Sequence, residues 1–284
     1  LHTNILASAL FAATSGSTVA TAATIGTIAQ PIQAKLGYNE RMVLGSIASG
    51  GTLGILIPPS INMIVYGALT SVSIGKLFIA GIIPGIALAL TMSAIIVVVS
   101  LIWGDHHKDE GPLPPLVRRI KMLLDLTPVF FIFLLVMGGI YTGLATPTEA
   151  AAIGIVAALL VAAANKTLSI GMLHEAFLSA MRTTAMVMLV LTTAFLLNFS
   201  LSLPGLPQQV SEYIRDLHWS PTMTIWVLVV FYLLLGIFIE AMAMMVTTVG
   251  IVTPLVVSLG FDPVWFGVFI TVMMELSIIS PPVG

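Results

Sequence analysis

Long apolar stretches separated by short polar ones dominate the hydrophobic pattern of the chain. A bilayer core of about 30 Å needs roughly 20 apolar residues of helix to cross it. Residues 77–103, 122–144, 147–164 and 183–203 meet this requirement, and residues 222–239 are equally apolar. The pattern predicts an all-α polytopic membrane protein.

Two further apolar stretches are interrupted by paired prolines. They are residues 42–70, interrupted at Pro58 and Pro59, and residues 264–284, interrupted at Pro281 and Pro282. Each proline lacks a backbone N–H and its ring crowds the preceding turn, so a helix cannot pass through unbroken. Free backbone groups at membrane depth are tolerated only where they are buried in protein or line a cavity. We therefore expect two proline-broken helices with a function at each break.

Two segments of the chain match each other at a constant offset of 223 residues. Residues 28–39 read IAQPIQAKLGYN, and residues 251–262 read IVTPLVVSLGFD. The same offset superimposes the two proline pairs, which a shared apolar composition does not explain. The pattern indicates an internal repeat.

Each copy of the repeat begins with two apolar arms joined by a short polar break. The arms are too short for two crossings plus a loop, so we expect re-entrant hairpins at residues 1–36 and 221–260. We expect five crossings between the hairpins, and an odd number places them on opposite faces of the membrane. Such an inverted-topology repeat is typical of secondary transporters, whose substrate site lies near the membrane midplane.

The chain is accordingly divided into two repeats around one polar loop. The first repeat is residues 1–103, the loop is residues 104–121, and the second repeat is residues 122–284. The loop carries four of the ten Lys and Arg residues, and the positive-inside tendency places it in the cytoplasm. Counted from there, eight of the ten lie on the cytoplasmic side.

Composition narrows the class of protein further. Of the 284 residues, 58% are hydrophobic and 8% are charged, whereas soluble domains carry about 25% charged residues. This excludes a cytosolic enzyme, a secreted domain and a nucleic-acid binder, and the net charge of −2 provides no field for polyanions. The chain has no cysteine, which excludes disulfides and thiolate sites. It begins inside an apolar stretch at Leu1, and we interpret it as an internal fragment of a longer protein.

Four segments resemble the large membrane subunit of the tripartite ATP-independent periplasmic (TRAP) transporters of bacteria and archaea. They read SGSTVATAATIG (15–26), GGTLGILIPPSINMIVYGALTSVSIGKLFIAGIIPG (50–85), GLATPTEAAAIG (143–154) and ELSIISPPVG (275–284). The resemblance implies an elevator-type importer of the inner membrane that is driven by Na⁺. It also implies two protein partners, a small four-helix membrane subunit and a periplasmic substrate-binding protein. Substrates of the family are mostly carboxylates such as C4-dicarboxylates, sialic acids and other sugar acids.

The polar tip of the first hairpin is a candidate Na⁺ site. Hydroxyl and free carbonyl oxygens are hard ligands, and unwound backbone coordinates Na⁺ in transporters of this class. The expected ligands come from the tip and from the residues before the first proline break: Ser15, Gly16, Ser17, Gly50, Gly51 and Thr52. The alternative interpretation is close packing, because small residues let helices approach one another.

A second candidate Na⁺ site surrounds the polar break of the second hairpin. Its expected ligands are Glu240, Thr247, Thr248, Glu275 and Ser280. An ionisable group at the centre of a membrane costs about 2.5–3.5 kcal/mol, so a function is the default hypothesis. The alternative is a protonated or snorkelling carboxyl that ties the hairpin to its neighbour. Members of the family that the sequence resembles often carry Asp where this chain has Glu240.

The substrate is expected beside the two proline breaks, at Pro58, Pro59, Ser60, Asn62, Pro281 and Pro282. We expect no catalytic residue, no transition metal and no cofactor, with Na⁺ as the coupling ion. The predicted function is the transport subunit of a Na⁺-coupled, binding-protein-dependent importer of organic anions. Two alternatives stay open, a stand-alone divalent-anion/Na⁺ symporter of related fold and an intramembrane enzyme.

Overall fold

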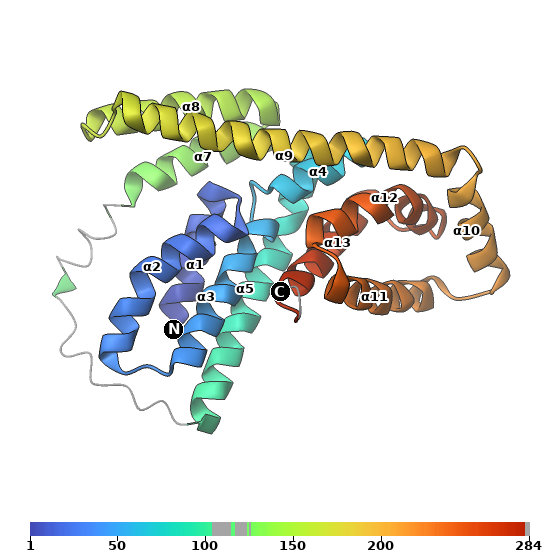
Figure 1. The fold of residues 1–284 in the computed structure, drawn as a ribbon, viewed down its shortest axis with the longest axis horizontal. Coiled ribbons are helices and arrows are strands. Elements are labelled where there is room, and N and C mark those ends of the chain that lie inside the picture. The colour runs from blue at the N-terminus through green and yellow to red at the C-terminus, as the bar shows by residue number, and fades with distance from the viewer. Residues whose placement is uncertain (104–114, 117–123, 125, 282–284) are drawn as a thin grey trace. The chain divides into compact units, whose positions relative to one another are not determined.

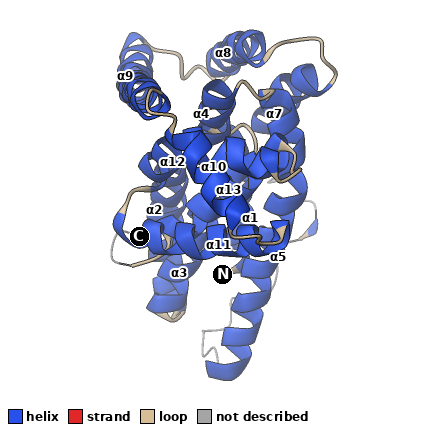
Figure 2. Cartoon of the chain, turned by 90° about the vertical axis from the view of Figure 1, so that its right-hand side faces the viewer, coloured by secondary structure: helices blue, strands red, loops and turns tan. Residues whose placement is uncertain are grey.

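The structure is a computed structural model that describes residues 1–103, 115–116, 124 and 126–281. Every regular element in that part of the chain is an α-helix, which confirms the expected all-α class (Figure 2). Six helical segments there are long and apolar enough to cross a membrane, as expected for a polytopic membrane protein. Most of the expected loop at 104–121 and part of the expected span at 122–144 lie outside the described residues.

The helices follow one another along the chain in the order labelled in Figure 1. They are α1 (His2–Ser15), α2 (Thr18–Leu36), α3 (Glu40–Leu56), α4 (Ile61–Thr70), α5 (Ile74–Trp103), α7 (Thr127–Tyr141), α8 (Pro147–Ala164), α9 (Ile170–Ser202), α10 (Leu206–Asp216), α11 (Pro221–Phe238), α12 (Ala241–Ser258) and α13 (Pro263–Ile278). The chain forms two compact units. Residues 1–54 and 87–178 form the first, and residues 55–86 and 179–284 form the second.

A buried polar cluster joins α1, α2 and α3 in the first unit. Asn4 Nδ2 donates to Gln33 Oε1 over 3.0 Å, and Gln33 Nε2 donates back to Asn4 Oδ1 over 2.7 Å. Asn4 Nδ2 also donates to Ser46 Oγ over 2.8 Å, and all three side chains are buried. Because an unpaired amide is costly in an apolar interior, this cluster requires one particular alignment of the three helices. In the same unit α7 packs against α8.

The second unit is built around α12 and α13, which pack against each other and against α4. The Tyr66 hydroxyl in α4 donates to the carbonyl oxygen of Pro263 over 2.7 Å. Gly267 allows the close approach, because a Cβ there would lie 2.5 Å from both Leu77 Cδ2 and Tyr66 Cε1. The crossing of α13 over α4 and the start of α5 therefore depends on the absence of a side chain at Gly267.

Polar side chains set the starts of several helices. Residues whose side chains accept a hydrogen bond from a backbone N–H of the first turn are Ser17 in α2, Ser60 in α4, Ser220 in α11, Glu240 in α12 and Asp262 in α13. At α8, Thr146 and Glu149 cap each other reciprocally. These caps satisfy N–H groups that have no partner inside the helix.

Two elements differ from the sequence-based expectation. The span expected at 183–203 belongs to a longer helix, α9, which begins at Ile170 after Ser169 Oγ accepts from Met172 N over 3.1 Å. The charged residues in the first turns of α9 are compatible with a helix, because their side chains are exposed. No element was expected at α10, because a search for uniformly apolar spans overlooks an amphipathic helix. Its side chains range from the buried Pro207 to the exposed Glu212.

Candidate functional site

The first helix break separates α1 from α2 at Gly16 and Ser17. Gly16 ends α1 with a φ of 60°, and its N–H donates to the carbonyl oxygen of Ala12 over 2.9 Å. Glycine adopts this left-handed conformation without steric penalty, which explains its place here. Ser17 Oγ then accepts from Ala20 N over 3.3 Å and caps α2. The break is therefore a turn with defined hydrogen bonds, at which α1 ends and α2 begins.

Three hydroxyl residues gather at this break. Ser15 Oγ and Thr21 Oγ1 lie 3.0 Å apart, and Thr21 Oγ1 donates to the carbonyl oxygen of Ser17 over 2.7 Å. Thr21 is fully buried, and sequence reasoning missed it. Thr21 lies four residues after Ser17, about one helical turn away, and this spacing could have identified it from the sequence. The described part of the chain thus brings several hard oxygen atoms together at Ser15, Ser17 and Thr21.

The neighbouring helix α3 approaches the break through Gly54. A Cβ at Gly54 would lie 3.1 Å from the carbonyl carbon of Ser17 and 3.2 Å from its oxygen. Gly54 was not among the predicted site residues, although it follows the predicted Gly50, Gly51 and Thr52 in α3. The structure thus places α3 backbone directly beside the Ser17 carbonyl.

The predicted glycines of α3 lie farther along its contact with the hairpin. A Cβ at Gly50 would lie 2.8 Å from Ser8 Oγ, and one at Gly51 would lie 2.8 Å from the Cβ of Ala22. Thr52 is buried, and its hydroxyl donates to the carbonyl oxygen of Ser49 over 2.7 Å. Close packing therefore accounts for Gly50 and Gly51 directly, and their role as Na⁺ ligands stays a prediction.

The second helix break separates α11 from α12 at Ile239 and Glu240. Glu240 is exposed, and its Oε2 accepts from Ala243 N over 3.0 Å. Glu240 lies 223 residues after Ser17, and Ala243 lies 223 residues after Ala20. The repeat offset found in the sequence therefore also relates the two capping hydrogen bonds.

The other residues predicted for the second Na⁺ site do not share one environment. Thr247 Oγ1 donates to the carbonyl oxygen of Ala243 over 2.8 Å, and Thr248 Oγ1 lies 2.9 Å from the Tyr232 hydroxyl. Thr247 and Thr248 lie about two turns into α12, given 3.6 residues per turn. Glu275 is buried in α13, and Ser280 Oγ donates to the carbonyl oxygen of Leu276 over 2.7 Å.

A hydrogen bond that sequence reasoning missed connects α13 to the end of α11. Ser277 Oγ donates to the carbonyl oxygen of Gly236 over 3.0 Å, and a Cβ at Gly236 would lie 2.7 Å from the Cβ of Ser277. Ser277 lies 223 residues after Gly54. In both copies of the repeat, the same position of the proline-broken helix therefore contacts the hairpin close to its break.

The first proline break has a defined local structure. The chain leaves α3 after Leu56, passes Pro58 and Pro59, and starts α4 with Ser60 as its N-cap. Ser60 Oγ accepts from Met63 N over 3.4 Å and donates to the carbonyl oxygen of Ile55. This single hydroxyl thus bridges the end of one helix and the start of the next.

The remaining expected substrate residues flank the two proline breaks. Asn62 lies in the first turn of α4 and is half-buried. Pro281 follows the end of α13, and Pro282 lies outside the described residues. Among the residues that the structure describes, no group of three or more His, Cys, Asp or Glu side chains is arranged to hold a metal ion.

The two helix breaks differ in charge although they share a capping geometry. The first offers hydroxyl and carbonyl oxygens, whereas the second offers the Glu240 carboxylate. The residue 223 positions after the buried Thr21 is Met244, which is also buried and has no hydroxyl. A cation at the first break would meet neutral oxygen atoms, and one at the second break would meet a full negative charge.

Comparison with known proteins identifies relatives along the whole chain. The family described as "Tripartite ATP-independent periplasmic transporter, DctM component" matches residues 2–284. The C4-dicarboxylate TRAP transporter large permease protein DctM of Pseudomonas aeruginosa is 36% identical over 284 residues, covering 99% of this chain and 65% of its own length.

Two further relatives carry other names. The sialic acid TRAP transporter large permease protein SiaM of Vibrio cholerae is 31% identical over 291 residues. The 2,3-diketo-L-gulonate TRAP transporter large permease protein YiaN of Escherichia coli is 30% identical over 292 residues. Both alignments cover 100% of this chain and 66% of the relative. The chain therefore spans slightly less than two thirds of the length of these relatives.

Proposed function

Because this chain belongs to the DctM component family of the tripartite ATP-independent periplasmic transporters, we propose that it forms the ion-coupled core of a large permease subunit. In this proposal the subunit imports an organic anion across the inner membrane, and a Na⁺ gradient drives the import. The family consists of transporters, so the intramembrane-enzyme alternative is discarded.

The observation that carries this proposal is the pair of equivalent helix breaks capped by Ser17 and Glu240. In transporters with inverted repeats, discontinuous helices place free backbone groups and helix ends around ions and substrate. Two such breaks at one repeat offset are what that architecture needs. We infer that the pairs α1–α2 and α11–α12 are re-entrant hairpins entering from opposite faces, and that their block moves against a scaffold as an elevator.

We assign the Na⁺ sites to the two breaks. At the first, Ser15, Ser17 and the buried Thr21 supply oxygen atoms, and Gly16 supplies the turn between the two helices. At the second, Glu240 supplies the charge. Glu275 and Ser280 complete the second site in this proposal, as the sequence suggests. The substrate lies beside the Pro58–Pro59 and Pro281–Pro282 breaks, near Ser60 and Asn62.

The names of the relatives support a proposal for the class of substrate. Their printed substrates are C4-dicarboxylates, sialic acid and 2,3-diketo-L-gulonate, all of which are organic anions. We propose that this chain transports a member of the same chemical class. The proposed partners are a periplasmic substrate-binding protein and a small membrane subunit. One relative is named as a single isethionate TRAP transporter permease protein DctMQ, and we propose that the large and small subunits are fused in such members.

Uptake by the full-length permease in proteoliposomes tests the proposal. The liposomes contain the permease with its small subunit, and the binding protein is added outside together with radiolabelled C4-dicarboxylate, sialic acid or 2,3-diketo-L-gulonate. Uptake of one of these anions is expected only with an inward Na⁺ gradient and the binding protein. Uptake without the binding protein would favour the stand-alone symporter, and full uptake from a proton gradient alone would contradict Na⁺ coupling.

A further inference from the structure

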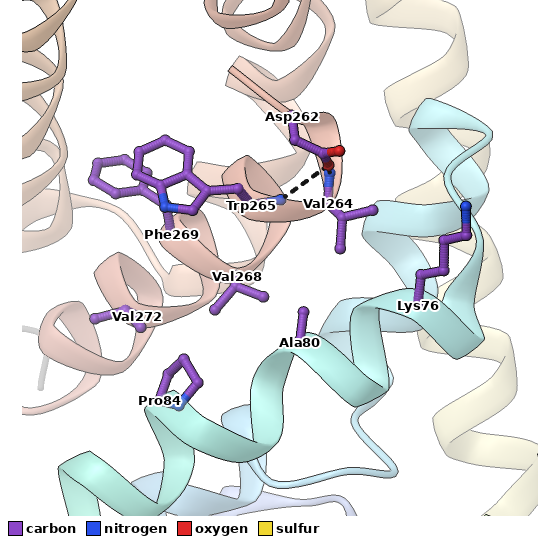
Figure 3. A pocket seen from close by; sticks show the side chains of 9 residues that line it. All are labelled: Lys76, Ala80, Pro84, Asp262, Val264, Trp265, Val268, Phe269 and Val272. Atoms are coloured by element: carbon purple, nitrogen blue, oxygen red, sulfur yellow. Dashed lines mark hydrogen bonds between the residues drawn. The ribbon is translucent and has the colours of Figure 1, made fainter. Parts of the chain in front are cut away.

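A groove of about 570 Å³ runs between the first part of α5 and α13, within the second compact unit (Figure 3). Ala80 and Pro84 line it from α5, and Val268 and Val272 line it from α13. Neither the proposed ion sites nor the proposed substrate site uses these residues. The groove is apolar along most of its length, so a bound molecule must present an apolar segment to it.

Two opposite charges lie at one end of the groove. Lys76 and Asp262 are both exposed and both line this end, whereas Pro84 and Val272 lie at the other end (Figure 3). Asp262 Oδ1 accepts from Val264 N over 2.6 Å, so the carboxylate is held in place by the start of α13. Within the residues that the structure describes, the Lys76 ammonium has no ion-pair partner. The groove therefore combines an apolar channel with a cation and an anion at its mouth.

The length of the groove matches one leaflet of a bilayer. Lys76 and Pro84 are eight residues apart, which corresponds to about 12 Å along α5 at 1.5 Å per residue. One leaflet contributes about 15 Å of the hydrocarbon core, which is about 30 Å thick. A transmembrane helix of another protein would need about twice that length of contact. The dimensions thus favour an acyl chain over a crossing helix.

An aromatic strip that is specific to the second repeat contributes Trp265 and Phe269 to the lining of the groove. The Trp265 ring stacks on Phe261 with centroids 4.9 Å apart and on Phe269 with centroids 5.5 Å apart. Trp265 is 41% exposed although it belongs to an apolar helix. The residues 223 positions earlier are Tyr38, Met42 and Ser46, of which only the first is aromatic. The repeated fold itself therefore does not require the strip, and exposed tryptophan is enriched at membrane interfaces.

We propose that this groove binds a phospholipid whose headgroup carries both a phosphate and a primary ammonium. One acyl chain lies against Ala80, Val268 and Val272. The phosphate lies near Lys76, and the ammonium donates to the Asp262 carboxylate. A choline headgroup has no N–H to donate, and a glycerol headgroup has no cation, so the charge pair distinguishes phosphatidylethanolamine from both.

Native mass spectrometry of the full-length permease complex tests this site. The complex is equilibrated in nanodiscs of phosphatidylethanolamine, phosphatidylcholine and phosphatidylglycerol in equal amounts, and the retained lipids are counted after transfer to detergent. We expect one retained phosphatidylethanolamine in the wild type and its loss in Ala80→Trp, which fills the groove. Ile83→Trp is the matched control, because Ile83 is exposed on the same helix and does not line the groove.

The headgroup contacts are tested separately by two substitutions that preserve shape. Asp262→Asn keeps an oxygen that can cap α13 but removes the charge, so the preference for phosphatidylethanolamine over phosphatidylcholine should disappear. Lys76→Gln removes the cation proposed beside the phosphate, so it should reduce the retention of phosphatidylethanolamine. Where Ala80→Trp lowers the melting temperature, Val268→Phe serves as a second variant that fills the groove.

The proposal is overturned if Ala80→Trp and Val268→Phe retain the wild-type lipid, or if the wild type shows no headgroup preference. A photoreactive residue in place of Val272 gives an independent answer. An adduct with lipid supports the proposal, and an adduct with another protein segment contradicts it. Lipid retention is measured without transport, so this result is separate from the outcome of the uptake experiment.

Discussion

Ser17 and Glu240 cap the second helix of two hairpins at positions 223 residues apart. Ser17 Oγ accepts from Ala20 N over 3.3 Å, and Glu240 Oε2 accepts from Ala243 N over 3.0 Å. The backbone donor is the third residue after the cap in both cases, but one acceptor is neutral and the other is a carboxylate. Each residue therefore has a structural task that must be separated from its proposed role in ion binding.

Replacement of Ser17 by Ala should weaken Na⁺ dependence more than it weakens the fold. Loss of an N-cap costs about 1 kcal/mol of stability. Ser220 caps α11 in the same way, accepting from Met223 N over 3.2 Å, and lies at the end of α11 opposite to the second break. We therefore expect Ser17→Ala and Ser220→Ala to lower the melting temperature by similar amounts. Only Ser17→Ala should raise the Na⁺ concentration required for half-maximal uptake.

Purified full-length protein serves for both measurements, with melting followed in detergent and uptake in proteoliposomes. If the two variants show the same Na⁺ dependence as the wild type, Ser17 is a cap and a packing residue only. Ser17→Thr, which keeps the hydroxyl, should restore Na⁺ dependence toward the wild-type value.

Replacement of Glu240 by Gln should reduce Na⁺-driven uptake while the fold is preserved. The Gln side chain keeps an oxygen that can accept from Ala243 N, but it no longer carries a negative charge. Glu149→Gln is the matched control, because Glu149 Oε2 accepts from Thr146 N over 2.8 Å at the start of α8. We expect several-fold lower uptake at limiting Na⁺ for Glu240→Gln, about one order of magnitude for each 1.4 kcal/mol lost. Equal effects of the two changes would argue against a Na⁺ ligand at Glu240.

The amide pair of Asn4 and Gln33 should contribute to stability as a unit. Replacing either residue alone by Val leaves the other amide buried without its partner, and a loss of about 1–3 kcal/mol is expected. The double variant Asn4→Val/Gln33→Val installs the residues found at the equivalent positions of the second repeat, Val227 and Val256. Its destabilisation should be smaller than the sum of the single effects. Additive melting shifts would show that the two hydrogen bonds do not act together.

The proposed inverted topology predicts opposite accessibility at the two hairpin turns. Gly37 and Gly260 form these turns with φ of 80° and 91°, where a cysteine would be strained. The probes are therefore placed two residues earlier, at the exposed Lys35 and Ser258, which are again 223 residues apart. In a full-length chain without other cysteines, an impermeant maleimide should reach Ser258→Cys from the periplasm. It should reach Lys35→Cys only after the membrane is opened.

Labelling of both positions from the same side would contradict the inverted repeat. A cysteine in place of the exposed Lys166 is the control for the cytoplasmic side, and one in place of the exposed Lys76 is the control for the periplasmic side. The labelling of these two controls shows whether the membrane is intact in the same cells.

Most helices and the helix breaks were readable from the sequence because their signals are local. A run of about 20 apolar residues predicts a span by itself, and paired prolines interrupt a helix wherever they occur. The cap at Ser17 and the turn at Gly16 follow from residue type within a few positions. The helix α10 was missed because its signal is an amphipathic pattern, and only uniformly apolar stretches were taken as membrane segments.

The contacts at the candidate sites were decided by the tertiary structure alone. The burial of Thr21 beside Ser15, the bond from Ser277 to Gly236 and the packing of Gly50 on Ser8 depend on how each helix is rotated about its axis. In a soluble protein the apolar stripe of a helix reveals that rotation. Helices of a membrane protein are apolar on nearly every face, because lipid and protein interior are both apolar surroundings. The sequence therefore determined which stretches are apolar enough to cross a membrane and where the helices break, and only the folded chain determined which oxygen atoms meet at those breaks.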